Sequence, residues 1–187
     1  MKPFSQNVIF YDAEFSDLDA YNGELLSVAL VKYSGEELYL ELDYDGPVSE
    51  WVSEHLSHLL SSEKKISRSD ARERIISFVG EDKPFLVAYV NQFDMAFWHK
   101  LFHIEDHDCL YSNHEPNHWI PIDFASILFG FGINPEHPSR KGREDFYRQF
   151  GIDVAKYDYH NALDDARLLR DVWMILEKQG FGNVKSI

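Results

Sequence analysis

The sequence has a single cysteine, a minority of basic residues and no long apolar run. One cysteine, Cys109, excludes an internal disulfide and is compatible with a reducing compartment. No apolar run reaches the roughly 18 residues of a membrane-spanning helix, and the N-terminus lacks the apolar region of a signal peptide. We therefore expect a cytoplasmic protein that does not contact a membrane.

Acidic residues outnumber basic ones by 32 to 18, which gives a net charge of −14. A protein that holds duplex nucleic acid along a groove is usually basic, so this charge argues against tight non-specific DNA binding by the whole surface. It leaves room for an enzyme that holds a few nucleotides where metal ions supply positive charge. The 187 residues, 44% of them hydrophobic, predict one domain spanning residues 1–187 with a sizeable core.

The order of the apolar patterns predicts a mixed α/β architecture. Strands expected at residues 8–15, 25–33 and 37–43 are joined by short turns and form an antiparallel meander. Strands at residues 84–90 and 119–122 follow helices and should run parallel to the first strand. The expected helices cover residues 48–60, 71–79 with a cap at Ser69-Asp70, 94–102, 124–129, 144–150 and 161–178. This is a five- to six-stranded sheet flanked by helices.

The first strand ends in two carboxylates, Asp12 and Glu14. Side chains at positions i and i+2 of a strand lie on the same face, so these two acids should point the same way. Like charges held that close repel each other, and a divalent cation between them is the simplest explanation. The alternative is a strand that ends earlier, with both acids in a solvated loop.

Another carboxylate falls on an apolar helix face near the C-terminus. On a helical wheel Asp165 lies inside the apolar stripe of this helix, whereas Asp164 lies near the edge of the stripe. The helix dipole and solvation are enough to stabilise the charge of Asp164. A lone carboxylate on a buried face is costly unless it is paired or binds a metal. The alternative for Asp165 is a salt bridge to a buried Arg or Lys. The stripe consists of Ala162, Ala166, Leu169, Val172, Trp173 and Leu176.

Two further residues have the right chemistry in suitable places. Asp94 follows a predicted parallel strand, and sites gather at the carboxyl ends of such strands; the alternative is ordinary N-capping. His160 lies five positions before Asp165, and an imidazole can take a proton from water near neutral pH. The alternative is a surface histidine, one of nine in the chain.

Together these residues appear in the order Asp-x-Glu, Asp, His-x4-Asp. This order resembles the DEDDh family of 3′–5′ exonucleases. The motifs that carry the resemblance are residues 10–15, 88–94 and 160–166, and the last, His-x-Ala-Leu-x-Asp-Ala, is the most specific. Within the family the chain looks most like the small ribonuclease-T-like exoribonucleases of the mycobacterial type, which have phage exodeoxyribonuclease relatives. Ala13 departs from the Thr that is common there.

The resemblance implies a ribonuclease-H-like fold and hydrolysis of single-stranded nucleic acid, or of 3′ overhangs, to nucleoside 5′-monophosphates, with RNA favoured over DNA. It implies that Asp12, Glu14, Asp94 and Asp165 hold two Mg²⁺ or Mn²⁺ ions, and that His160 accepts the proton of the attacking water. The 3′ ends of single-stranded RNA or DNA are the expected partners. Relatives are often homodimers, so a homodimer is also expected.

The resemblance also places contacts with the terminal nucleotide at Ala13, through its backbone, Glu14 and Phe15. The Phe15 ring suits stacking on a base, and its alternative role is that of a core phenylalanine. The basic run at residues 140–143 is either a contact for substrate phosphates or a solvated loop.

Three other readings stay open. The histidines between His103 and His118, together with Cys109, have ligand types that suit zinc, although their spacing matches no familiar finger. The chain is alternatively a catalytically idle nucleic-acid-binding module on the same fold, or an exodeoxyribonuclease. The sequence does not distinguish RNA from DNA, because recognition of the 2′-hydroxyl depends on geometry.

Overall fold

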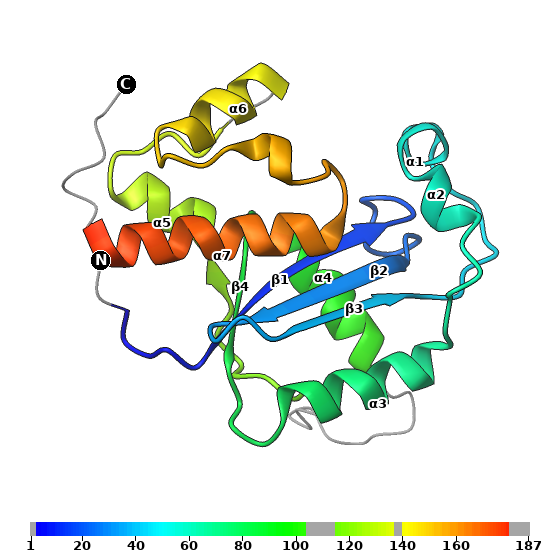
Figure 1. Ribbon diagram of the computed structural model, residues 1–187. Coiled ribbons are helices and arrows are strands. Elements are labelled where there is room, and N and C mark those ends of the chain that lie inside the picture. The colour runs from blue at the N-terminus through cyan, green and yellow to red at the C-terminus, as the bar shows by residue number, and fades with distance from the viewer. Residues whose placement is uncertain (1–2, 104–114, 137–139, 180–187) are drawn as a thin grey trace.

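The computed structural model describes residues 3–103, 115–136 and 140–179, and its centre is a five-stranded mixed sheet (Figure 1). The strand order is β3-β2-β1-β4-β5. The first three strands pair antiparallel, whereas β4 runs parallel to β1, and β5 runs parallel to β4. The predicted mixed sheet is therefore confirmed. The strands are β1 Val8–Phe15, β2 Leu25–Lys32, β3 Glu37–Glu41, β4 Phe85–Ala88 and β5 Ile122–Asp123.

Helices cover both faces of the sheet. Helices α5, α6 and α7 pack on one face, and α3 and α4 pack on the other (Figure 1). None of the helices in the described ranges is long and apolar enough to cross a membrane. The helices are α1 Glu50–His55, α2 Ser57–Leu60, α3 Arg68–Val79, α4 Gln92–Phe102, α5 Phe124–Gly130, α6 Arg140–Arg148, the 3₁₀ turn η1 Val154–Lys156, and α7 Ala162–Gln179.

Strand β1 is the central strand because it is apolar on both faces. Phe10 packs under α7, where its ring lies edge-on to Trp173 with centroids 5.6 Å apart. Ile9 and Tyr11 enter the opposite layer with α3 and α4. The partner β4 covers only the start of β1, from Val8 to Phe10. The carboxyl end of β1 therefore extends beyond its pairing with β4. One face of β1 is covered by α7.

Several boundaries differ from the predictions. Helix α3 begins at Arg68, because the Ser67 side chain accepts a hydrogen bond from the backbone N–H of Asp70 and serves as the cap in place of Ser69-Asp70. On this helix Ile75 is buried, whereas Ile76 is 47% exposed. The helix predicted at residues 48–60 is divided at Leu56, whose φ of −115° is not helical.

The loop expected before residue 144 is helical from Arg140 onward, since α6 begins there. Its buried face consists of Arg143, Phe146 and Tyr147, and Phe150 just after the helix continues it. These positions have the i, i+3, i+4, i+7 spacing of an amphipathic helix. An arginine at the first of the four positions hid the pattern. The short turn η1 was also not predicted, and β5 is shorter than the strand expected at residues 119–122.

Candidate active site

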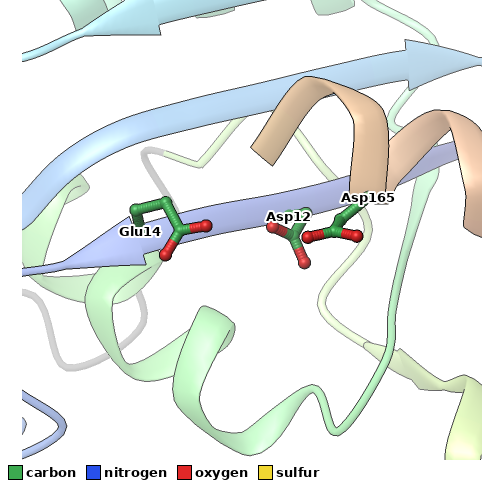
Figure 2. Close-up of side chains that lie close together, drawn as sticks. All are labelled: Asp12, Glu14 and Asp165. Atoms are coloured by element: carbon green, nitrogen blue, oxygen red, sulfur yellow. The ribbon is translucent and has the colours of Figure 1, made fainter. Parts of the chain in front are cut away.

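Three carboxylates from two distant parts of the chain converge at the carboxyl end of β1. Asp12, Glu14 and Asp165 each offer an oxygen, and these oxygens all lie within 4.8 Å of one another. Figure 2 shows Asp165 reaching from α7 toward Asp12, with Glu14 farther along β1. The structure thus brings these predicted residues together, and the alternative of a solvated loop for Asp12 and Glu14 is wrong because both lie within β1.

The position of Asp165 follows from the packing of α7 on the sheet. Ala162 and Ala166 are fully buried, and their small side chains allow the first turns of α7 to lie close to β1 and β2. Asp165 shares this face and lies in the first turn of the helix, where the macrodipole favours an acidic group. The helical-wheel prediction therefore places the right one of the two adjacent acids in the cluster.

Asp94 lies in the first turn of α4, directly after β4, and is only 6% exposed. Asn91 occupies the N-cap position of that helix, so N-capping is not the role of Asp94. The Tyr11 hydroxyl donates to the Asp94 backbone carbonyl across 3.3 Å. The charge of Asp94 raises the pKa of both Asp12 and Glu14, so it belongs to the same electrostatic cluster although it is outside the three-carboxylate group.

Burial raises the pKa of every acid in the cluster, and repulsion from other cluster members raises it further for Asp12 and Glu14. Burial first, and then the charges of Asp165, Asp94 and Glu14, raise the pKa of Asp12. Burial raises the pKa of Glu14 and of Asp94 to about 8 each, and that of Asp165 to about 6. A cluster of hard oxygen ligands that is short of positive charge is the donor set that Mg²⁺ and Mn²⁺ prefer. These side chains therefore fit a divalent-cation site.

Arg143, expected within a basic run that contacts phosphates or is solvated, is instead buried beside the acidic cluster. Arg143 of α6 is 7% exposed, and its Nη2 forms an ion pair with Asp165 Oδ1. Its guanidinium also lies 4.3 Å from the centre of the Tyr159 ring. The salt bridge to a buried arginine, the alternative reading of Asp165, is present, and metal binding by Asp165 stays a prediction. The helical spacing of α6 is the sequence signal that would have found Arg143.

The neighbouring acid, Asp164, was expected to be simply solvated, and this is wrong. Its carboxylate accepts a hydrogen bond from Arg167 Nη1 at 2.8 Å and another from the backbone N–H of Asp158 at 2.9 Å. Arg167 in turn binds Glu37 on β3. Asp164 therefore helps to tie the start of α7 to its surroundings, outside the three-carboxylate group.

His160 lies two residues before the start of α7, the helix that carries Asp165, in a left-handed conformation with φ of 59°. The ring is half-buried and lies edge-on to Trp51, with centroids 4.8 Å apart. Burial, followed by the charges of Arg143 and His55, lowers the pKa of His160 to about 4. Its imidazole is therefore neutral at physiological pH and has a lone pair to accept a proton. A freely exposed surface histidine, the alternative reading, does not fit this environment.

The residues expected to contact substrate flank the cluster. Ala13 is buried, and a backbone hydrogen bond from it lowers the pKa of Asp94. Phe15 is half-buried and stacks on Phe97 with centroids 4.3 Å apart, as a core phenylalanine would. The zinc reading lies mostly outside the described residues, because residues 104–114 are not among them.

In fold, the chain is similar to an Exonuclease I from Methylocaldum szegediense. The two structures superpose with a TM-score of 0.64 at 17% sequence identity, over 92% of this chain and 40% of that one. The present chain therefore spans less than half of that protein. No protein-family model matches the sequence, and no curated protein is significantly similar to it. The likeness confirms the predicted ribonuclease-H-like fold of a mixed sheet flanked by helices.

Proposed function

We propose that this protein is a metal-dependent 3′–5′ exonuclease of the DEDDh type. Its substrate would be single-stranded nucleic acid or a 3′ overhang, with RNA favoured over DNA, and its products nucleoside 5′-monophosphates. The observation that carries the proposal is the convergence of Asp12, Glu14 and Asp165 within 4.8 Å. The fold shared with an exonuclease supports the same chemistry.

In this proposal Asp12, Glu14, Asp94 and Asp165 hold two Mg²⁺ or Mn²⁺ ions. The raised pKa values of these four groups support it, because a bound dication stabilises carboxylates whose charged form is disfavoured by burial and, at Asp12 and Glu14, also by repulsion. When bound, two such ions supply the positive charge that stabilises an in-line phosphoryl displacement. The carboxylates would fix the position of these ions, and the 3′-terminal phosphodiester would bind to them at the carboxyl end of β1.

The proposed role of His160 is that of the general base. With a pKa lowered to about 4, its ring is unprotonated at neutral pH and can accept the proton of the attacking water. The His160 backbone donates a hydrogen bond that lowers the pKa of Asp165, which ties this residue to the acidic cluster.

The terminal nucleotide would lie against Ala13, Glu14 and Phe15, at the end of β1 that β4 leaves uncovered. The preference for RNA comes from the sequence resemblance to small exoribonucleases. We further propose that the protein acts in the cytoplasm and that it forms a homodimer. Light scattering of the purified protein would test the homodimer.

The decisive experiment uses 5′-labelled single-stranded RNA and DNA of one sequence, incubated with Mn²⁺ or with EDTA. We expect a ladder that shortens from the 3′ end, fastest on RNA, with 5′-monophosphates released and no reaction in EDTA. A 3′-phosphate on the substrate serves as the polarity control. Faster DNA hydrolysis would favour the exodeoxyribonuclease alternative. Binding without hydrolysis would favour the idle module, in which the ion pair between Arg143 and Asp165 persists.

A further inference from the structure

The guanidinium of Arg143 lies at a carboxylate that the proposed metal site requires. We propose that Arg143 is a displaceable counter-cation. In the metal-free protein it neutralises Asp165, and when a divalent cation binds at Asp165 the guanidinium moves into an adjoining cavity. This proposal rests on the metal site of the proposed function.

The geometry sets the two cations in competition. Asp165 contributes one oxygen to the group of three that lies within 4.8 Å, and its Oδ1 pairs with Arg143 Nη2. Arg143 approaches from α6, a different helix from the one that carries Asp165. A metal ion that takes Asp165 as a ligand therefore has to weaken this ion pair before it can use both oxygens of the carboxylate.

In the metal-free protein the ion pair offsets part of the negative charge of the buried acids. Four acids lie together in and around the site, and burying them without a counter-charge is unfavourable. Arg143 is itself buried, and its ion pair with Asp165 supplies a positive charge beside these acids. The arginine thereby stabilises the fold when no metal is bound.

A cavity of about 850 Å³ adjoins Arg143, between α6 and the segment around η1. Three acidic residues, Glu144, Asp153 and Asp158, line it together with one further arginine, Arg148, so the lining favours an added cation. Tyr159 also lines it, and the face of that ring already lies 4.3 Å from the Arg143 guanidinium. When Arg143 is released from Asp165, the acidic lining of the cavity and the face of the Tyr159 ring can therefore stabilise its guanidinium.

The first test compares Mn²⁺ affinity in the unaltered protein and in the Arg143→Gln variant by isothermal titration calorimetry. The matched control is Arg148→Gln, because Arg148 lines the same cavity from the same helix but pairs with Asp145. We expect Arg143→Gln to bind Mn²⁺ about 10- to 100-fold more tightly, the scale of a lost charge-assisted hydrogen bond. It should also unfold at a lower temperature in EDTA. Arg148→Gln should change neither property.

A second measurement uses the unaltered protein, in case Arg143→Gln does not fold. The Nε–Hε signal of Arg143 is assigned by its absence in Arg143→Lys and followed by NMR during a Mg²⁺ titration. We expect it to shift and to exchange faster with water at saturation, while the signal of Arg148 stays in place. A signal of Arg143 that does not respond to saturating Mg²⁺ would overturn the displacement.

The outcomes separate this proposal from the proposed function. Unchanged or weaker Mn²⁺ affinity in Arg143→Gln would overturn the role of Arg143 and leave the metal site intact. Mn²⁺ binding that Asp165→Asn does not reduce would place the ion elsewhere and overturn both. A complete lack of Mn²⁺ binding by the unaltered protein would also overturn both.

Discussion

Replacing Asp165 by Asn, next to a parallel replacement of Asp164, probes the site with two changes that differ by a single position. Both substitutions remove one negative charge from the first turn of α7 and keep the side-chain shape. Only Asp165 belongs to the three-carboxylate group with Asp12 and Glu14. We therefore expect Asp165→Asn to weaken metal binding strongly and Asp164→Asn to leave it almost unchanged.

The structure sets the expected magnitudes. Replacing a residue that only supports a metal ligand typically lowers metal affinity by about 10- to 100-fold, so loss of the Asp165 carboxylate should lower it by at least about 100-fold. Asp164→Asn should change the affinity by less than about 10-fold, the lower end of that scale, because Asp164 is outside the three-carboxylate group. It weakens the pair with Arg167, whose own side chain is 40% exposed, and this should cost about 0.2–1 kcal/mol of stability.

The assay is Mn²⁺ titration followed by calorimetry, with nuclease turnover measured on the same preparations. Circular dichroism and thermal unfolding in EDTA show that each variant is folded. If Asp164→Asn abolished Mn²⁺ binding while Asp165→Asn retained it, the assignment of these two neighbours from the helical register would be refuted.

Three further predictions follow from the same geometry. His160→Ala should lower kcat by about 10²- to 10⁴-fold, the scale of general-base catalysis, with Mn²⁺ affinity retained. In EDTA the free energy of unfolding should fall as the pH rises from about 4.5 to about 8, because folded Glu14 and Asp94 hold protons that the unfolded chain has lost; the slope is up to about 1.4 kcal/mol per pH unit for each proton, and urea titrations measure it. Phe15→Ala should raise KM for oligonucleotides. It should also lower the free energy of unfolding by at least roughly 0.5–1.5 kcal/mol, the contribution of its stacking on Phe97.

Each of these predictions has its own control. For His160→Ala, an unchanged kcat would remove the histidine from the reaction. For the pH dependence, saturating Mn²⁺ should flatten the slope, and a metal-free protein whose stability rises over the same range would contradict the raised pKa values of Glu14 and Asp94. For Phe15→Ala, the comparison is Phe97→Leu, which disturbs the same stack from the buried side. A similar KM change in both variants would assign Phe15 to the core alone.

The central features of the fold were predictable because strong local patterns agree with the tertiary structure. The apolar run before Asp12 needs burial on both faces, and only a central strand provides it. The placement of Asp165 followed from helical periodicity, because an acid inside an apolar stripe faces the sheet. The approach of Asp165 to Asp12 and Glu14 could therefore be predicted without knowing the structure of the segments between β1 and α7.

What the sequence did not predict depends on contacts between segments that are distant in the chain. Arg143 reads as part of a polar loop until Asp165 and the aromatic face of α6 are placed around it. The partners of Asp164 are likewise supplied by the segment before α7 and by Arg167, which also reaches β3. The helical spacing of α6 can place Arg143 on a buried face, but it does not show that its partner is Asp165 on another helix.

The most direct test of the central claim is anomalous diffraction from crystals of the protein soaked in Mn²⁺. We predict two peaks, separated by about 4 Å, within bonding distance of the carboxylates of Asp12, Glu14, Asp94 and Asp165. The absence of any peak at these carboxylates under saturating Mn²⁺, with peaks elsewhere on the molecule, would contradict it.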